Sequence, residues 1–402
     1  MRAGEPTLPE VTQASPRGHA SLAAGLRWVI SFPHVPVVHP VGDRVGAVGA
    51  VDAVDTRDAA ALRLRRNRRR WRRDHIWRPA AYLAPTLILL GVFDVYPIFL
   101  AAWISLWRWG IRAERFIGLD NYRRIGAELT GGAAGGPGEV GNSLLVTGFF
   151  VVGTVPLTIV IAFAVANMLY ARVRFLTALR TAYFVPYITS TVAAGLAFVW
   201  LFNPQVGVLN ALLNVFGLPA QQWLLDPTPI VPKLLGALNL GWADSLPGVL
   251  AGPSVALSCV IVFSVWNTLG FAVVIILAGL VAINPELREA ARIDGANPWQ
   301  MATRVTLPLV SPTLFFLLVV STIRAFQTFN EVYVLTGGGG YGAKAGAPLD
   351  TTLTLPVLVF RYLYERPGSV GYSAALSMLL FALLLALTLL QFRTAGRRVH
   401  YD

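Results

Sequence analysis

The sequence is poor in charge and in cysteine. Only 13% of the 402 residues are charged, 55% are hydrophobic, and the mean hydropathy is +0.59. Soluble globular chains carry about 25% charged residues, so this composition excludes that class and predicts a membrane protein. Because Cys259 is the single cysteine, the chain can form neither an internal disulfide nor a thiolate metal site.

Side chains that bind metals or catalyse reactions are also scarce. Four of the five histidines precede residue 76 and the fifth is His400, and their spacing matches no metal site. The glycine run at 337–344 does not match the phosphate-loop pattern, because Ala345 follows Lys344 where a serine or threonine is required. We therefore expect no metal, no cofactor and no enzymatic activity in this chain.

Long apolar runs are abundant instead. A helix needs about 20 apolar residues to cross a hydrocarbon core of about 30 Å. Asp94 interrupts the first run, and Arg324 and Glu331 interrupt the fifth. The expected fold class is all-α, a polytopic membrane protein with six transmembrane helices. These spans cover about residues 80–107, 143–169, 181–202, 254–283, 307–335 and 371–392.

Arginine is distributed unevenly between the loops. Residues 61–80 hold nine arginines against one aspartate, arginines without acids lie in 170–180, and three further arginines follow residue 392. With six crossings these three segments share one side, which the positive-inside rule identifies as the cytoplasm, so both termini are expected inside the cell membrane. The opposite loop at 203–253 holds one lysine against two aspartates, whereas the loop at 108–142 is close to neutral.

The basic run before the first span has two interpretations. RRNRRRWRR is typical of an RNA-binding arm, but arginine beside a transmembrane segment is explained more simply as an orientation anchor. We expect residues 1–75 to be an unstructured, arginine-rich cytoplasmic extension or to reflect a start assigned too early, and 76–402 to be the transmembrane domain. Only two of the 33 basic residues are lysine, which indicates a GC-rich and therefore bacterial genome.

A polar stretch at 284–308 separates the fourth and fifth apolar runs. Asn284-Pro285 and Asn297-Pro298 each combine an N-cap residue with proline at the first helical position. Gly295 lies between them and is suited to the left-handed conformation that ends a helix. The pattern predicts two short cytoplasmic helices joined by a glycine turn.

The first of these helices has one face with small side chains at its centre. Leu287, Ala290, Ala291 and Asp294 share that face at helical spacing, and the two alanines would let another protein approach closely. The alternative is an ordinary amphipathic loop lying on the membrane surface. Spacing alone leaves both interpretations open.

The same stretch resembles a known sequence motif. Its residues are similar to the EAA loop of permease subunits in ATP-binding-cassette importers. That resemblance implies a coupling helix that docks into a cytoplasmic ATPase subunit. Ala302 departs from the pattern, because a large apolar residue is usual there. The residues that carry the resemblance are Glu289, Ala290, Ala291, Asp294, Gly295, Ala296, Leu307 and Pro308.

Other segments extend the resemblance from about residue 76 to the C-terminus. FIGLDNYRRI, VWNTLGF and FQTFNEVYVLTGGG are similar to carbohydrate-type permeases related to the maltose and glycerol-3-phosphate systems. The resemblance implies a permease subunit of a binding-protein-dependent sugar importer. Its implied partners are a second homologous permease, a pair of ATPase subunits that bind the ATP, and an extracytoplasmic solute-binding protein. Residues 238–254 look like an insertion relative to this family.

Polar side chains within the apolar runs are candidates for a substrate path. An ionisable group at mid-helix costs about 2.5–3.5 kcal/mol on insertion scales, so it rarely faces lipid. If the fifth span is one continuous helix, Arg324, Gln327, Thr328 and Glu331 share one face. Trp266 and Asn267 in the fourth span are further candidates. The alternative is that Arg324 and Glu331 form a structural contact between helices.

Two other functions compete with the importer. An ion-coupled secondary transporter would use Asp94 and Glu331 as its ion-binding carboxylates, although the inverted repeats of such carriers are not detectable here. A membrane-anchored enzyme is excluded, because the sequence holds no convergent set of nucleophile, base and metal ligands.

Overall fold

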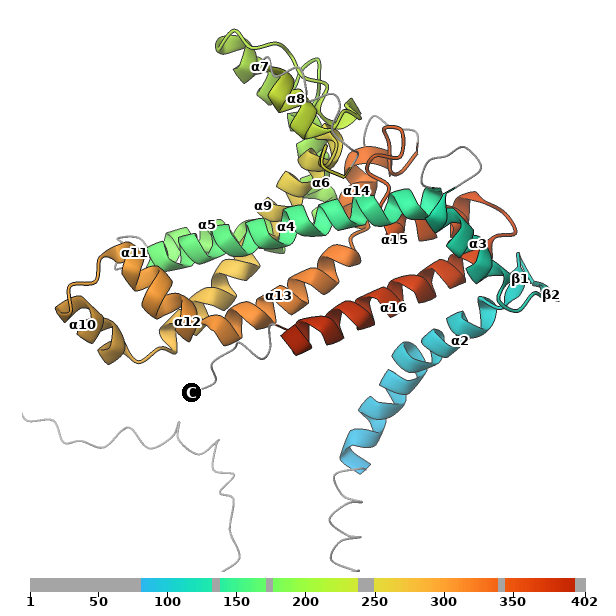
Figure 1. Cartoon of the computed structure of the whole chain (residues 1–402), viewed down its shortest axis with the longest axis horizontal. Coiled ribbons are helices and arrows are strands. Elements are labelled where there is room, and N and C mark those ends of the chain that lie inside the picture. Colours follow the sequence, from blue (N-terminus) through green and yellow to red (C-terminus); the bar gives the residue numbers. More distant parts are fainter. Residues whose placement is uncertain (1–80, 132–137, 171–175, 238–248, 339–343, 395–402) are drawn as a thin grey trace, which may run out of the picture. The chain divides into compact units, whose positions relative to one another are not determined.

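The computed structural model describes residues 81–131, 138–170, 176–237, 249–338 and 344–394. The chain divides into two units, residues 1–82 and 83–402, and the description below concerns the second unit (Figure 1). The expected N-terminal extension and residues 238–248 of the expected insertion lie outside the described residues, so both remain predictions.

Long apolar helices make up most of the structure. Within the described residues, four helices are long and apolar enough to cross a membrane, and two further bent pairs raise the number to six if each pair is one crossing. This confirms the all-α prediction. The four helices are Ala81–Ile104, which ends in α2 (Tyr96–Ile104), α4 (Glu139–Tyr170), α9 (Val255–Val281) and α16 (Val370–Thr394).

The third span is not the single helix that we predicted over 181–202. It consists of α5 (Leu176–Ile188) and α6 (Thr191–Leu201), and the two apolar parts meet at 101°. Pro186 lies inside α5 and removes one backbone donor, and the helix ends two residues later. The prediction failed because an uncharged run reports hydrophobicity and not helix continuity.

The fifth span also departs from the predicted helix over 307–335. α11 (Pro298–Gln300) continues through a π-helical turn into α12 (Leu307–Leu309), which meets α13 (Ser311–Phe326) at 72°. Pro312 explains this bend, because its ring conflicts with a helical carbonyl four residues earlier. The chain leaves helical geometry again at 327–329 before α14 (Asn330–Tyr333).

Shorter elements connect these spans. The first span ends at Ile104 and not at 107, because the chain turns there into an antiparallel hairpin, β1 (Trp107–Trp109) and β2 (Ala113–Phe116). The remaining α-helices of the described residues are α3 (Asp120–Thr130), α7 (Val208–Val215), α8 (Ile230–Ala237), α10 (Pro285–Ile293) and α15 (Leu355–Phe360). A 3₁₀ turn covers Trp223–Leu225, and π-helical turns follow α14 and α15 at Val334–Gly338 and Arg361–Glu365.

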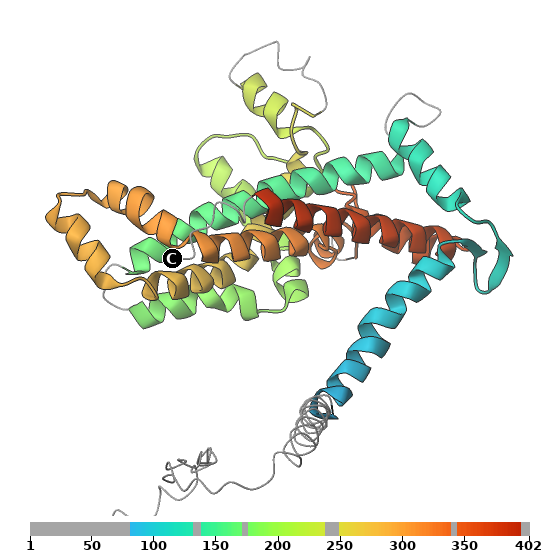
Figure 2. The same cartoon turned by 60° about the horizontal axis from the view of Figure 1, so that its bottom comes forward.

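The connections gather at two ends of the helix bundle. α10 and α11 lie at one end, near the C-terminal end of α16, whereas α3, β1 and β2 lie at the other end (Figures 1 and 2). α4 runs between the two ends. This is the arrangement that the predicted six-crossing topology requires for the loops at 108–142 and 284–308.

The core of the bundle is a close packing of α4, α5 and α9. Phe150 and Phe263 are fully buried in the largest cluster of apolar side chains. A Cβ atom on Gly153 would lie 2.8 Å from the Ile261 side chain, and one on Gly270 would lie 2.1 Å from the Tyr183 carbonyl oxygen. Small residues therefore permit the helix contacts, as is usual between membrane helices.

Polar side chains join the chain segments at the end of the bundle that carries α3. The Glu139 carboxylate accepts hydrogen bonds from the Tyr362 hydroxyl at 2.8 Å and from both terminal nitrogens of Arg366, at 2.8 and 2.5 Å. The hydrogen bonds that Arg366 donates to Glu139 raise the pKa of Arg366. Arg124 of α3 donates to the same Tyr362 hydroxyl at 3.1 Å. One ionic cluster therefore joins α3, the start of α4 and the segment after α15.

The segment between α6 and α9 is also fixed by polar side chains. Asn210, which is buried, accepts hydrogen bonds from the Gln221 backbone at 3.0 Å and from the Trp223 indole at 2.8 Å. Partial burial alone would raise the pKa of Asp226, but hydrogen bonds from Lys233 and Thr228 outweigh burial and lower it. These contacts hold α7 and α8 to the chain that leads into α9.

The Gly270 contact yields a stability prediction. We expect Gly270→Ala to destabilise the protein by about 1–3 kcal/mol, because the added methyl group would overlap the α5 backbone and force the helices apart. Gly148→Ala in α4 is the matched control, since nothing lies within 4 Å of its Cβ position. Thermal unfolding of both variants in detergent measures the difference, and equal midpoints would contradict the close α5–α9 contact.

Candidate functional site

The polar stretch at 284–308 forms the two-helix hairpin that its sequence predicts. The Asn284 side chain accepts from the Glu286 backbone at 3.1 Å and so caps α10. Asn297 and Gln300 exchange side-chain hydrogen bonds with each other's backbone, at 2.8 and 3.0 Å, in a capping box at the start of α11. Gly295 between them takes the left-handed conformation with φ +81°.

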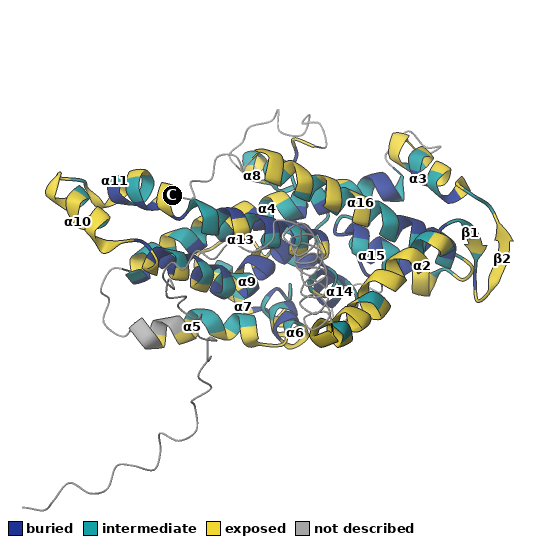
Figure 3. Ribbon diagram, turned by 90° about the horizontal axis from the view of Figure 1, so that it is seen from below, coloured by how far each residue is buried: buried dark blue, intermediate teal, exposed yellow. Residues whose placement is uncertain are grey.

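The hairpin projects its side chains away from the bundle. None of the α10 residues is buried, and Figure 3 shows this helix exposed along its length. Glu289, Ala290 and Asp294 are exposed, and Ala291 is half-buried. In the turn after α10, Gly295 is exposed and Ala296 is half-buried, and Leu307 and Pro308 are exposed in α12. None of the eight motif residues is therefore buried within this chain.

Sequence reasoning missed the largest apolar groups of this surface. Ile293 is 86% exposed and Trp299 is 76% exposed, one on each side of the glycine turn. Two large apolar side chains in water on a small hairpin are typical of an interaction site. The signal was present in the sequence, because both residues stand out within a polar stretch.

One contact ties the hairpin to the bundle. The Arg288 guanidinium lies over the Tyr170 ring, 4.2 Å from its centre, at the end of α4. Met301, which is 6% exposed, anchors the start of the π-helical turn. The hairpin is therefore packed at its base and free at its tip.

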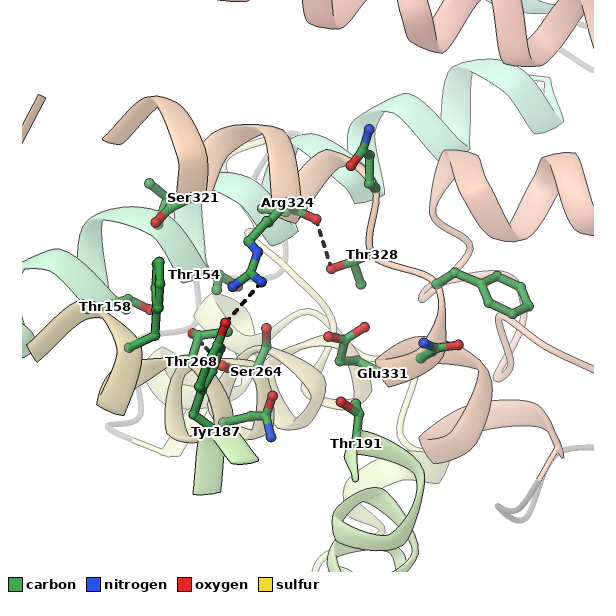
Figure 4. Close-up of a pocket in the computed structure, with 18 residues that line it drawn as sticks. Thr154, Thr158, Tyr187, Thr191, Ser264, Thr268, Ser321, Arg324, Thr328 and Glu331 are labelled. Carbon is green, nitrogen blue, oxygen red and sulfur yellow. Dashed lines mark hydrogen bonds between the residues drawn. The ribbon is translucent and has the colours of Figure 1, made fainter. Parts of the chain in front are cut away.

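A second feature is a polar cavity among the apolar helices. Its volume is about 520 Å³, within the range of about 300–1,000 Å³ that is typical of small-molecule sites. Residues of α4, α5, α6, α9, α13 and α14 line it, together with the break at 327–329 (Figure 4). Five of the six predicted path residues line this cavity: Asn267, Arg324, Gln327, Thr328 and Glu331.

Two details of the prediction differ from the structure. The predicted face required one continuous helix, but α13 ends at Phe326 and Glu331 belongs to α14. The residues meet because the chain bends around the cavity. Trp266 does not belong to the residues that line it. Its ring packs against Phe198 at 4.9 Å between centroids, so this side chain serves the interface between α6 and α9.

Arg324 makes its contacts with aromatic side chains. Its guanidinium donates to the Tyr187 hydroxyl at 3.2 Å and lies 5.1 Å from the centre of the Phe271 ring, which stacks on Tyr187 at 5.2 Å. Among the described residues no ion pair joins Arg324 to Glu331. Both charges therefore face the cavity instead of neutralising each other.

Hydroxyl groups complete the wall of the cavity. Thr154 and Thr158 of α4 are buried, and within the described residues their hydroxyls have no hydrogen-bond partner. Ser264 and Thr268 repeat the same four-residue spacing on α9. This spacing of hydroxyls within uncharged helices is a signal that the sequence analysis did not use. Ring faces and unpaired polar groups together suit a solute that is rich in hydroxyls.

Asp94 lies elsewhere. It is exposed in the first helix, within the turn Gly91–Val95, and it is not one of the residues that line the cavity. The two carboxylates of the ion-coupled alternative therefore do not share a site.

Comparisons with known proteins identify the family of the chain. Residues 129–398 match the family described as binding-protein-dependent transport system inner membrane component. The chain is 30% identical over 318 residues to the trehalose/maltose transport system permease protein MalF of Thermococcus litoralis, covering 79% of this chain and 92% of that protein. It is 30% identical over 327 residues to the sn-glycerol-3-phosphate transport system permease protein UgpA of Agrobacterium fabrum, covering 80% and 96%.

The fold is also similar to a solved structure. One chain of a bacterial ABC transporter involved in the import of the acidic polysaccharide alginate aligns with a TM-score of 0.61. The sequences are 22% identical, and the alignment covers 82% of this chain and 99% of that chain. These findings lend no support to an ion-coupled carrier. The chain belongs to the family of inner membrane components of binding-protein-dependent transport systems, in which it is a multi-pass permease subunit and not an enzyme.

Proposed function

We propose that this chain translocates a sugar or a sugar-like polyol, driven by ATP hydrolysis on a separate cytoplasmic subunit. The observation that carries the proposal is the cavity, in which serine and threonine side chains and two charged side chains line a space of about 520 Å³. Sugar hydroxyls donate to carboxylates and accept from guanidinium groups, so Glu331 and Arg324 suit opposite ends of such a solute. The names of the relatives, which include a lactose permease of Rhizobium radiobacter, support this class.

The exposed hairpin is the proposed contact with the ATPase. Ile293 and Trp299 supply the apolar centre of that contact, and Glu289 and Asp294 supply charge at its rim. Force on the hairpin would pass through α12 into α13. At its far end α13 carries Arg324, about 20 Å along the helix from Ser311 at 1.5 Å per residue. Movement of the hairpin is thereby transmitted to the wall of the cavity.

The other proposed partners are a second, homologous permease and an extracytoplasmic solute-binding protein. The first helix supports the permease partner, because none of the residues in its apolar window is buried within this chain. The family description supports the binding protein. A cavity bordered by the bent α5–α6 pair would be completed by the second permease. The hairpin would lie in the cytoplasm with both termini, and the hairpin β1–β2 would lie outside.

The coupling role predicts a transport defect. We expect Glu289→Lys to reduce ATP-dependent sugar uptake by roughly tenfold or more, because a reversed charge at the rim opposes docking of the ATPase. Glu365→Lys makes the same change at an exposed position near the other end of the bundle and should leave uptake unchanged. Uptake into proteoliposomes with an ionophore present measures both variants, at equal membrane levels. Normal uptake by Glu289→Lys would contradict the coupling assignment.

The cavity predicts a change in solute affinity. Hydrogen bonds to charged groups contribute about 1.5–3 kcal/mol, so Glu331→Gln should raise the half-saturating solute concentration roughly tenfold or more. Trp266→Phe, a change outside the cavity, is the control and should leave this concentration unchanged. If the two variants behave alike in uptake titrations, the cavity is not the solute path.

The proposed orientation predicts from which side of the membrane an impermeant reagent can label an introduced cysteine. In a Cys259→Ser background, we expect Trp299→Cys to react with a membrane-impermeant maleimide only in inside-out vesicles. We expect Arg112→Cys in the β1–β2 turn to react only from outside intact cells. Labelling of Trp299→Cys from outside would place the hairpin on the wrong side for an ATPase.

A further inference from the structure

The hairpin β1–β2 carries an unusual concentration of positive charge. Arg108 lies directly opposite Arg115 in the strand register, and both side chains are exposed. Arg112 is exposed in the turn, and Glu114 is the single acid between residues 107 and 116. Within the described residues, none of these arginines forms an ion pair. Like charges placed opposite each other destabilise a strand pair, so an anionic partner would stabilise this one.

Aromatic side chains place the hairpin at the membrane surface. Trp107 packs edge-on against its cross-strand neighbour Phe116 at 5.4 Å, and Trp103 at the end of the first helix lies 5.7 Å from Trp107. Tryptophan is enriched where the hydrocarbon core meets water. Because successive residues of a strand point to opposite faces, the rings occupy one face of the hairpin and the arginine pair the other. With the rings at this interface, the arginines would be within reach of lipid headgroups.

An apolar cavity begins beside the same hairpin. Its volume is about 230 Å³, and it lies between α2, α15 and the start of α16. The cavity is mostly apolar, so part of a flexible acyl chain can pack in it. Its apolar walls include Pro97, Leu100, Ile104, Val359, Leu363 and Val370.

The cavity and the charged pair adjoin. Ile104 in the cavity wall is four residues before Arg108. Val370 in the opposite wall precedes Gly371, whose Cβ position would lie 2.1 Å from the Trp107 carbonyl oxygen. The end of the cavity formed by α16 therefore touches the backbone of β1, next to the arginine pair.

We propose that the β1–β2 hairpin and this cavity form a binding site for an anionic phospholipid of the outer leaflet. Arg108 and Arg115 would donate hydrogen bonds to the phosphate and headgroup, which guanidinium groups recognise better than ammonium groups. One acyl chain would occupy the cavity beneath them. The site is separate from the solute cavity and from the cytoplasmic hairpin, so it does not depend on the proposed function. The lipid would fix the first helix against α16 at the outer surface.

Native mass spectrometry of the full-length chain in detergent can test this proposal. The chain is titrated with phosphatidylglycerol, with phosphatidylcholine and with inorganic phosphate at increasing salt. We expect tighter binding of phosphatidylglycerol than of phosphatidylcholine, weakening with salt, and no retention of phosphate alone. The paired change Arg108→Gln and Arg115→Gln should weaken phosphatidylglycerol binding roughly tenfold, and Ala374→Phe, which fills the cavity, should weaken both phospholipids.

Two controls separate a specific site from general charge. Arg123→Gln removes an exposed arginine of α3 outside the site and should leave binding unchanged. Arg108→Lys with Arg115→Lys keeps the charge but loses the guanidinium geometry, so its affinity should lie between that of the unaltered chain and that of the glutamine pair, which also shows that the strands still fold. Equal binding of both phospholipids by the unaltered chain would overturn the proposal. So would an Arg108→Gln and Arg115→Gln variant that keeps its lipid but no longer binds a solute-binding protein, because the pair would then be a protein contact.

Discussion

The structure depends on the requirement that every backbone polar group within the hydrocarbon core find a partner in the protein. Continuous helices meet this requirement along α4, α9 and α16. The two interrupted spans meet it differently. The Pro186 carbonyl, near the end of α5, accepts from the Asn267 side chain at 3.0 Å, and the Thr328 carbonyl at the second interruption accepts from the Thr354 hydroxyl at 3.3 Å. Both interruptions border the same cavity, where irregular backbone is tolerated.

The cavity lies where the interruption of the third span meets the interruption of the fifth span. The breaks expose Tyr187 and Thr191 on one side and the segment 327–329 on the other, so side chains from separate helices point into a common space. The fifth span then links this space to the hairpin at 284–308, because α12 and α13 follow each other without a loop.

The two ends of the bundle are built on different principles. At the α10 end, Arg288 and Met301 pack at the base of the hairpin. The side chains at its tip are exposed, so the tip is available to another protein. At the other end, Glu139 and its partners bind α3, α4 and the segment after α15 into one ionic cluster. A rigid end and an accessible end suit a subunit that receives force on one side only.

The sequence by itself determined the fold class, the approximate spans and the capped hairpin, because hydrophobic run length and helix caps are local properties of the chain. It also predicted that Arg324 and Glu331 face a common space, and both line the cavity, although the continuous helix assumed for them is wrong. Only the tertiary structure decided that Trp266 packs between helices and that Arg324 meets Tyr187. It alone also shows that the Thr154 and Thr158 hydroxyls have no hydrogen-bond partner among the described residues. Those outcomes depend on how proline-bent helices from distant parts of the chain pack together, and local periodicity carries no information about such contacts.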